Sequence, residues 1–213
     1  MQYPDARILI FARAPVAGQV KTRLAADIGA ERAAQLYREL LQHTLEVAVA
    51  ARLCPVVCYC DPDCQHEFFQ EWRERGVLLA DQQGDDLGER MQHALQQQLQ
   101  EAGHAVLVGS DCPVLQQRHL QLAFDGLQDR QAVIAGAEDG GYALIGLKSA
   151  PREIFSGIEW SGSGVLQQTL QRFRQLSWQW RELETLWDVD RLEDLQRLAG
   201  FADYAYAIAS DRD

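Results

Sequence analysis

Positively charged side chains gather in one short segment of an otherwise acidic chain. Lys21 and Arg23 follow a loop of small and apolar residues, and Arg13 ends the apolar run before that loop. The 213 residues include 20 Lys and Arg against 31 Asp and Glu, a net charge of -11, yet residues 6–26 contain no acidic side chain. A buried strand, a loop and cations ahead of a helix can present backbone N–H groups and positive charge to a phosphate. The segment therefore predicts a phosphate-binding loop with the contact residues Arg13, Pro15, Gly18, Lys21, Thr22 and Arg23.

An acidic side chain occupies a comparable place after another apolar run. Asp111 follows residues 105–109, so its carboxylate stands just past the end of an expected buried strand. Magnesium prefers one or two protein carboxylates and takes its other ligands from water and phosphate oxygens. Asp111 is therefore a candidate metal ligand opposite the phosphate loop. The alternative is a residue that only makes a turn or caps the helix expected near Gln116.

Further carboxylates come from the segment that contains Asp188 and Asp190. Their side chains share one side of the chain if the segment is extended. Asp190 and Glu193 also have the spacing of a capping box, so Asp190 is a helix N-cap, a metal ligand, or both.

Paired glycines lie between the last two expected strands. Gly140 and Gly141 follow Asp139 and precede Tyr142, and such a pair permits positive φ angles or a close approach of the backbone. Asp-Gly is also a strong signal for a hairpin turn, which is the structural alternative.

Apolar runs and helical patterns alternate along the chain, and together they must position these residues. The expected strands are residues 7–12, 55–60, 77–80, 105–109, 132–137 and 142–147. The clearest helices are residues 31–51, with leucines on one stripe, and residues 86–102, which begin with a capping box. This alternation predicts a mostly parallel sheet covered on both faces. Ligands of such sheets bind beyond the carboxyl ends of the strands, where the phosphate loop and Asp111 both fall.

The loop and several later motifs resemble the nucleotide-diphospho-sugar transferase superfamily, which has the GT-A fold. The loop is not a Walker motif, because two residues separate Gly18 from Lys21 and no glycine precedes them. Residues 11–24 instead resemble the F-A-K-x-P-x-x-G-x-V-K-T-R-L motif of small bacterial glycosyltransferase-like proteins (DUF2064-like), with Arg13 in place of Lys. Phospholactate and molybdenum cofactor guanylyltransferases are similar at a greater distance. The resemblance implies an α/β, Rossmann-like three-layer sandwich with a mostly parallel mixed sheet.

The same resemblance implies a metal site. Residues 109–113 resemble G-T-D-C-P, whose Asp binds the divalent metal in GT-A proteins, and this implies that role for Asp111. Residues 188–195 are similar to D-x-D-T-P-E-D-L, whose second Asp joins the metal in several nucleotidyltransferases. Asp190 is therefore the expected second ligand and Asp188 a lesser candidate, although Arg191 and Leu192 replace Thr-Pro. The expected metal is Mg²⁺ or Mn²⁺.

Acceptor and nucleotide contacts also follow from the resemblance. Residues 138–146 resemble E-D-G-G-Y-Y-L-x-G, which faces the acceptor, and Asp139 is a candidate base. Residues 84–90 resemble G-x-D-L-G-x-R, where relatives bind the base or ribose; here Arg90 reaches the nucleotide or pairs with Asp86. Residues 160–162 are similar to a W-S-T near the acceptor, with Gly in place of Thr. The expected acceptor-binding residues are Asp139, Gly140, Gly141, Tyr142 and Trp160.

Length and composition favour a single domain over residues 1–213, in a cytoplasmic protein with no membrane or nucleic-acid partner. The resemblance implies that this domain is a GT-A-like nucleotide-binding transferase domain. The cysteines are expected to be reduced. A zinc site at Cys60, Cys64 and His66 is the alternative, although their spacing matches no common zinc motif.

The function expected is that of a metal-dependent transferase, glycosyltransferase-like, with catalytic residues Asp111, Asp139 and Lys21. Its partners would be a nucleotide or nucleotide-sugar donor and a small-molecule acceptor, and a homodimer is compatible with this. One alternative is a nucleotidyltransferase that releases pyrophosphate. Another is a protein that binds nucleotide without catalysis. The sequence does not decide which group moves.

Overall fold

Strand β1 (Ala6–Arg13) lies in the interior of the sheet because it carries an unbroken apolar run. Ile8, Leu9 and Ile10 are fully buried. Burial on both faces is typical of a parallel strand covered by helices on each side. In the computed structural model, which describes residues 1–160 and 162–198, parallel strands flank β1 on both edges.

Within the described residues the sheet has seven strands in the order β3-β2-β1-β4-β6-β5-β7. Only β6 runs antiparallel to its neighbours, β4 and β5. The carboxyl ends of β1, β2 and β4 therefore meet at one edge, and the turn between β5 and β6 lies at that same edge. The other strands are β2 (Val56–Asp61), β3 (Leu78–Asp81), β4 (His104–Val108), β5 (Ala132–Gly136), β6 (Tyr142–Leu147) and β7 (Trp180–Glu182).

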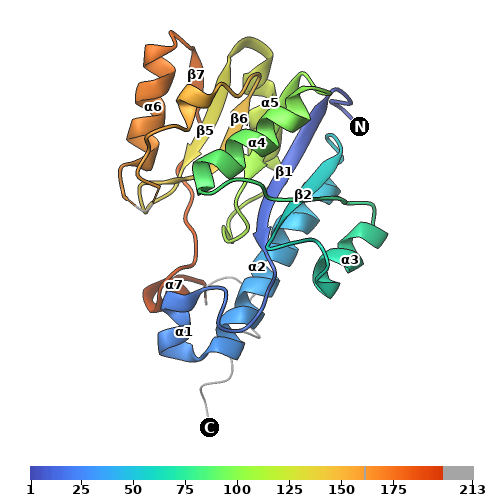
Figure 1. Cartoon of the computed structure of the whole chain (residues 1–213), viewed down its shortest axis with the longest axis vertical. Helices are drawn as coiled ribbons and strands as arrows, with labels where there is room; N and C mark the ends of the chain where they lie inside the picture. Colours follow the sequence, from blue (N-terminus) through green and yellow to red (C-terminus); the bar gives the residue numbers. More distant parts are fainter. Residues whose placement is uncertain (161, 199–213) are drawn as a thin grey trace.

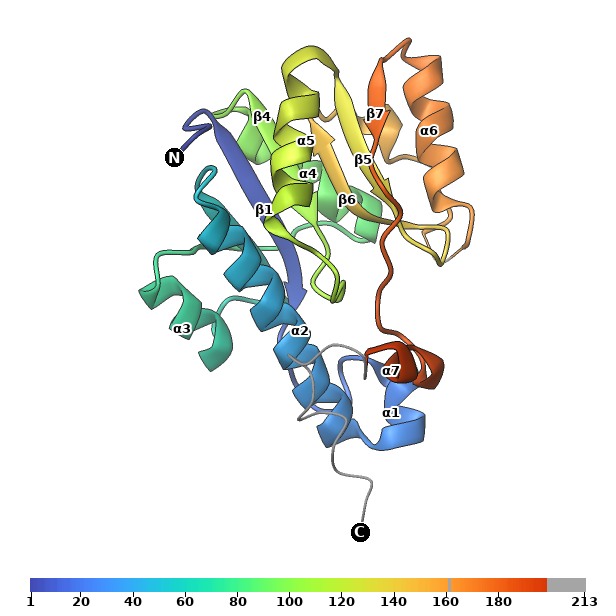
Figure 2. The same ribbon diagram turned by 180° about the vertical axis from the view of Figure 1, so that it is seen from behind.

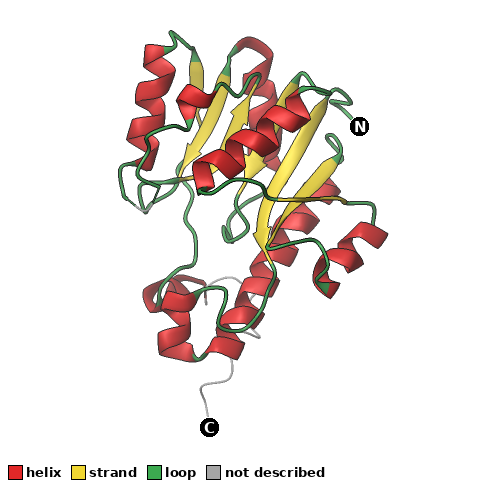
Figure 3. Cartoon of the chain, viewed as in Figure 1, coloured by secondary structure: helices red, strands yellow, loops and turns green. Residues whose placement is uncertain are grey.

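Helices cover the two faces of the sheet, as Figures 1 and 2 show from opposite sides. One face carries α2 (Ala30–Ala51), α3 (Glu67–Glu74) and α5 (Gln117–Asp129). The other carries α4 (Leu87–Leu99), the 3₁₀ turn η1 (Arg152–Ile154) and α6 (Val165–Gln175). Figure 3 shows the resulting three layers, with strands between helices. The predicted fold class is confirmed.

A third apolar cluster lies beyond the carboxyl edge of the sheet. Helix α1 (Thr22–Ile28), the first half of α2 and α7 (Leu192–Leu198) contribute to it, and a long connection joins β7 to α7 (Figure 1). Its buried members are Leu24, Leu36, Leu40, Trp187, Val189 and Leu198. This cluster holds the phosphate loop against the segment that carries Asp188 and Asp190.

The six expected strands are all present, each with ends within one residue of the prediction. Strand β7 is missing from the prediction because its three residues, Trp180 to Glu182, are mostly polar and lie at the sheet edge. No helix among the described residues has the length and apolar character needed to cross a membrane.

Candidate functional site

The carboxyl ends of β1 and β4 open onto a cleft of about 670 Å³, which the segment after β3 also lines. Its opposite wall comes from α1 and from Asp190, before α7. Pro15 and Gly18 belong to the phosphate loop but do not line this cleft. The expected site residues that do line it are Arg13, Lys21, Thr22, Arg23, Asp86, Arg90, Asp111 and Asp190.

Lys21 points into the cleft from a constrained backbone. It is the N-cap of α1, with φ 46° and ψ 43°, a left-handed conformation that costs a non-glycine residue roughly 1–3 kcal/mol. Its side chain is only 6% exposed, and Nζ lies 2.8 Å from Oδ2 of Asp111. The strained backbone thus aims a buried ammonium at the Asp111 carboxylate, in the loop that follows β4.

The charge of Lys21 is secured by its acidic surroundings. Burial by itself would lower the pKa of Lys21. The charges of Asp111, Asp190 and Asp188, together with the hydrogen bond to Asp111, outweigh burial and raise the pKa above its ordinary value. Lys21 is therefore fully charged at neutral pH.

A second ion pair crosses the same cleft. Nη1 of Arg23 lies 2.7 Å from Oδ2 of Asp190, and both side chains are partly exposed, which limits the contribution of such a pair to about 1 kcal/mol. The capping box predicted for Asp190 and Glu193 is not formed. Asp194 takes that role instead, because its Oδ2 accepts the backbone N–H groups of Asp190 and Arg191 at 2.9 and 2.7 Å.

Asp188 lies in the same acidic group as Asp111. The backbone N–H of Val189 donates to the carbonyl oxygen of Asp111 at 3.1 Å, which fixes the two segments together. Burial, followed by the charges of Asp111 and Asp139, raises the pKa of Asp188 to about 6, and the charge of Lys21 opposes this rise. The Asp188 carboxylate thus interacts with the carboxylates of Asp111 and Asp139 in the same region as the buried ammonium of Lys21.

The residues present fit a divalent cation. No three His, Cys, Asp or Glu side chains in the described part of the chain already form a metal-binding group. Mg²⁺ and Mn²⁺ nevertheless need few protein ligands when phosphate and water supply the rest. Asp111 and Asp188 offer hard oxygen donors whose mutual repulsion a cation would relieve. Since Lys21 already neutralises Asp111, a metal at this carboxylate would compete with the ammonium.

The residues of the zinc alternative have other roles. Cys60 is buried within β2, and Nδ1 of His66 accepts the backbone N–H of Phe68 as the N-cap of α3. All five cysteines are free thiols.

Arg13 and Arg90 share a carboxylate at the end of β2. Oδ2 of Asp61 lies 2.9 Å from Nε of Arg13, and Oδ1 lies 3.2 Å from Nη1 of Arg90. The alternative pairing of Arg90 with Asp86 is wrong. The carboxylate of Asp86 instead caps α4 by accepting the backbone N–H of Glu89 at 2.8 Å, as the capping box predicted.

Sequence reasoning missed several residues that build this cleft. The hydroxyl of Tyr37 accepts the backbone N–H of Arg13 at 2.9 Å and bonds to the Ser110 hydroxyl at 2.9 Å, joining the ends of β1 and β4. Gln82 donates to the carbonyl oxygens of Ala12 and Tyr59. Asp61 directly follows an expected strand, so the strand-end rule could have identified it.

The glycine pair forms the turn between β5 and β6. The backbone N–H of Gly140 donates to Ala137, and Oδ1 of Asp139 accepts the N–H of Gly141 at 2.8 Å. Gly140 has φ 93°, and a Cβ there would collide with the carbonyl group of Ser163. The hairpin turn, which was the structural alternative, is present, and no contact from the described residues engages Oδ2 of the exposed Asp139.

Two of the expected acceptor residues have packing roles. The Trp160 ring covers Gly88 at the start of α4 and lies edge-on to Tyr142, with ring centroids 6.4 Å apart. The Tyr142 hydroxyl contacts Sδ of Met91 at 3.7 Å. Neither aromatic residue lines the cleft, so their contact with an acceptor stays a prediction.

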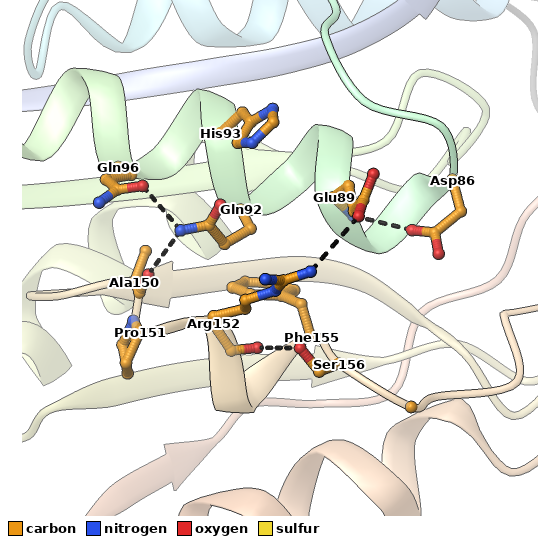
Figure 4. A pocket seen from close by; sticks show the side chains of 11 residues that line it. Asp86, Glu89, Gln92, His93, Gln96, Ala150, Pro151, Arg152, Phe155 and Ser156 are labelled. Atoms are coloured by element: carbon orange, nitrogen blue, oxygen red, sulfur yellow. Dashed lines mark hydrogen bonds and ion pairs between the residues drawn. The ribbon is translucent and has the colours of Figure 1, made fainter.

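A separate groove of about 610 Å³ lies between α4 and η1 (Figure 4). Gln92 bridges Gln96 and the carbonyl oxygen of Ala150 there, so its amide is already engaged. Asp86 lines both the groove and the cleft, which lie on either side of the start of α4.

Comparison with known proteins relates the chain to a bacterial family. The model of an uncharacterized protein family conserved in bacteria, DUF2064, matches residues 44–162. A solved structure from Desulfovibrio desulfuricans G20, provisionally named a nucleotide-diphospho-sugar transferase, is 32% identical. The match covers 97% of this chain and 93% of that one, with a TM-score of 0.84. No curated protein matches.

Two more distant structures share the fold. CMP:2-keto-3-deoxy-manno-octonic acid synthetase complexed with CTP is 13% identical over 92% of this chain and 97% of that chain, with a TM-score of 0.57. Rv0371C from Mycobacterium tuberculosis H37Rv, complexed with manganese, is 15% identical. The match covers 93% of this chain and 100% of that chain, also with a TM-score of 0.57.

Proposed function

The chain belongs to the DUF2064 family of bacterial proteins and is a nucleotide-dependent transferase, and we propose that it moves a glycosyl group from a nucleotide-diphospho-sugar to a small acceptor with a divalent metal. One observation carries this proposal. At the carboxyl edge of the sheet, two cations face two carboxylates: Lys21 faces Asp111, and Arg23 faces Asp190. A diphosphate and its metal need that combination of charges.

The cations of the cleft would hold the donor diphosphate. Lys21 and Arg23 would turn from their carboxylates to phosphate oxygens, and Arg13 and Arg90 would contact the same ligand from the opposite wall. Glycosyl transfer leaves negative charge on the departing nucleoside diphosphate, and donors already aimed at those oxygens stabilise it without reorganisation. These four side chains are the proposed phosphate-binding residues.

Asp111, Asp190 and the neighbouring Asp188 would hold Mg²⁺ or Mn²⁺. When bound, the metal would neutralise the diphosphate and so assist its departure. The manganese complex of the similarly folded mycobacterial protein supports testing Mn²⁺ first.

Asp139 is the proposed base. In the transfer step, an acceptor hydroxyl oxygen forms a bond to the anomeric carbon of the sugar. The bond from that carbon to the diphosphate oxygen breaks, and its electron pair stays with the diphosphate. The hydroxyl proton passes to the Asp139 carboxylate, whose Oδ1 is already fixed by the N–H of Gly141.

Binding and product analysis together test this function. Purified protein is screened for thermal stabilisation by nucleoside diphosphates, nucleoside triphosphates and nucleotide sugars, with and without Mn²⁺. The best ligand is then incubated with a panel of small hydroxylated acceptors. Release of a nucleoside diphosphate from a nucleotide sugar is the expected result.

The Asp111→Asn variant tests the assignment of the metal. It should lose about 100-fold or more in turnover, because a carboxylate that orients the metal and its phosphate is removed. Asp129→Asn is the matched control, since Asp129 is exposed and, within residues 1–160 and 162–198, forms an ion pair with its neighbour Arg130 alone. Full metal-dependent turnover by Asp111→Asn would remove Asp111 from the mechanism.

Other outcomes identify the alternatives. Release of pyrophosphate from a nucleoside triphosphate would make the protein a nucleotidyltransferase. Nucleotide binding without any product, across all donors and acceptors, would favour a non-catalytic nucleotide-binding protein. If no nucleotide changes the melting temperature, the proposal fails.

A further inference from the structure

Asp61 is a carboxylate that contacts two cations of the cleft lining, where the proposed ligand is itself an anion. Its side chain ends β2, is 20% exposed, and lies within ion-pair distance of both Arg13 and Arg90. A negative charge beside a phosphate site weakens phosphate binding by simple electrostatics. A carboxylate at this position must therefore contribute something that offsets its unfavourable effect on phosphate binding.

The contacts of the two arginines indicate what this carboxylate contributes. Arg13 binds Asp61 through Nε alone. Arg90 uses Nη1 for Asp61 and Nε for the carbonyl oxygen of Gly84, at 3.0 Å. Among the described residues, no contact engages the two terminal nitrogens of Arg13 or Nη2 of Arg90, and both side chains line the cleft. Donor groups from two guanidinium ions thus remain available on the cleft wall.

Two guanidinium ions repel each other when they lie side by side, and a carboxylate between them offsets this repulsion. The two oxygens of Asp61 are divided between the two arginines, so one residue fixes both. A planar guanidinium group matches the geometry of phosphate oxygens when its orientation is fixed.

We propose that Arg13, Asp61 and Arg90 form an anion clamp for a phosphoryl group of the donor, in which Asp61 is a positioning residue that contacts only the arginines. The proposal rests on the proposed function, because that function supplies the phosphorylated ligand. Each oxygen of Asp61 lies within ion-pair distance of one arginine, which suits a carboxylate that orients these two side chains.

For the Asp61→Ala variant, the anion clamp and simple electrostatics predict changes of anion affinity in opposite directions. Asp61→Ala removes a negative charge from behind the two arginines of the cleft lining, which by charge alone should strengthen anion binding. We expect binding of inorganic pyrophosphate to weaken about tenfold instead, because the loss of one or two charge-assisted hydrogen bonds has that effect. Titration calorimetry with pyrophosphate gives the comparison without requiring the nucleotide to be known.

Asp85→Ala is the matched control. Asp85 lines the same cleft and is exposed, but none of the described residues forms an ion pair with its carboxylate. Its removal should leave pyrophosphate affinity unchanged or raise it. Asp61→Asn keeps the shape of the side chain and one acceptor oxygen. Its pyrophosphate affinity should lie between the affinities of wild type and Asp61→Ala.

A mutant cycle separates positioning from a general structural role. Arg13→Ala and Arg90→Ala should each weaken pyrophosphate binding. In the Arg13→Ala/Arg90→Ala background, Asp61→Ala should cause no further loss, because the groups that it positions are gone. An equal loss in both backgrounds would overturn the proposal, as would unchanged or tighter binding by Asp61→Ala and Asp61→Asn.

The failure of this inference is distinguishable from failure of the proposed function. If wild type binds neither pyrophosphate nor nucleotides, both the proposed function and the anion clamp are contradicted. If wild type binds these ligands and the Asp61 variants bind pyrophosphate equally well, only the anion clamp is contradicted. Circular dichroism checks that each variant is folded, and Asp61→Asn decides the question if Asp61→Ala does not fold.

Discussion

At the level of single residues, the cleft is organised by ion pairs between elements far apart in the chain. Lys21 and Asp111 are separated by 90 positions, and Arg23 and Asp190 by 167. In each pair the cation is a proposed phosphate ligand and the acid a proposed metal ligand. Binding of a metal and a nucleotide must therefore break the same contacts, which couples the two events.

Lys21→Met should change metal and nucleotide affinity in opposite directions. With the ammonium removed, Mn²⁺ alone no longer competes with a cation at Asp111, and we expect its affinity to rise about tenfold. Nucleotide affinity should fall, because a buried phosphate ligand is lost. Electron paramagnetic resonance of free Mn²⁺ measures the first effect. Arg7→Met, which removes a charge outside the cleft lining, is the control, and unchanged Mn²⁺ binding in Lys21→Met would contradict this expectation.

Asp188→Asn should stabilise the metal-free protein at neutral pH. The pKa of Asp188 is raised to about 6 by burial and by the charges of Asp111 and Asp139, above its ordinary value of 3.8. The folded chain thus binds this proton more tightly than the unfolded chain does, and the carboxyl group contributes less to stability as pH rises between these two values. At pH 7 the variant should gain about 1–2 kcal/mol in free energy of unfolding.

Denaturant unfolding in chelator from pH 4 to pH 7 measures this difference. The advantage of Asp188→Asn over wild type should grow as pH rises through the window and be smallest at pH 4. A difference that is constant with pH would show that Asp188 does not titrate as its surroundings imply.

At the level of elements, the segment between β7 and α7 carries Asp188 and Asp190, and it is fixed at several points. Glu184 accepts from His119 at 2.6 Å and lies 2.9 Å from Arg118, which ties the segment to α5. Leu186 donates to Gly136 and accepts from Glu138, which ties it to the β5–β6 turn. The acidic residues are thus positioned by a connection rather than by a long helix or strand.

The β5–β6 turn offers a test of backbone fit. Gly140→Ala and Gly29→Ala both place a side chain at positive φ, which costs about 1 kcal/mol or more. Only at Gly140 would the new Cβ also collide with backbone, the carbonyl of Ser163, while at Gly29 the space is open. Gly140→Ala should therefore lose about 1–3 kcal/mol more than Gly29→Ala. Thermal unfolding compares the stability of the two variants. Equal losses of stability would contradict the close approach of Gly140 to the carbonyl group of Ser163.

At the level of the whole molecule, the cleft lies between two apolar regions. The sheet with its two helical layers forms one wall, and the cluster of α1, α2 and α7 forms the other. Helix α2 belongs to both, since Leu36 and Leu40 face the cluster while Leu41 and Leu45 face the sheet. We propose that the described part of the predicted domain over residues 1–213 folds as one unit, because this helix joins the two regions.

Core substitutions on either side of the cleft should shift one common transition. Leu24→Ala in the cluster and Leu127→Ala beneath the sheet each remove a fully buried side chain, and each should cost about 2–5 kcal/mol. Leu192→Ala is the control, because this leucine is 48% exposed. Circular dichroism and tryptophan fluorescence should give coincident midpoints in every variant. A separate early transition in Leu24→Ala would instead show that the cluster unfolds alone.

The sequence by itself determined the sheet and the two kinds of charge that its carboxyl edge presents. Apolar runs and helical periodicity depend on near neighbours in the chain, so β1 to β6 could be predicted within one residue. The same holds for Lys21 in its loop and for Asp111 after its strand. Strand β7 escaped prediction because a short edge strand needs no apolar pattern.

Only the tertiary structure decided which charges meet. Arg90 could pair with Asp86 one helical turn away, but Asp86 caps α4 and Arg90 reaches Asp61 on another strand. Likewise, the Asp190 carboxylate meets Arg23, because Asp194 already satisfies the start of α7. Local spacing shows which partners a side chain can reach, whereas the packing of distant elements determines which of them it binds, because packing decides which groups lie within hydrogen-bond distance of each carboxylate.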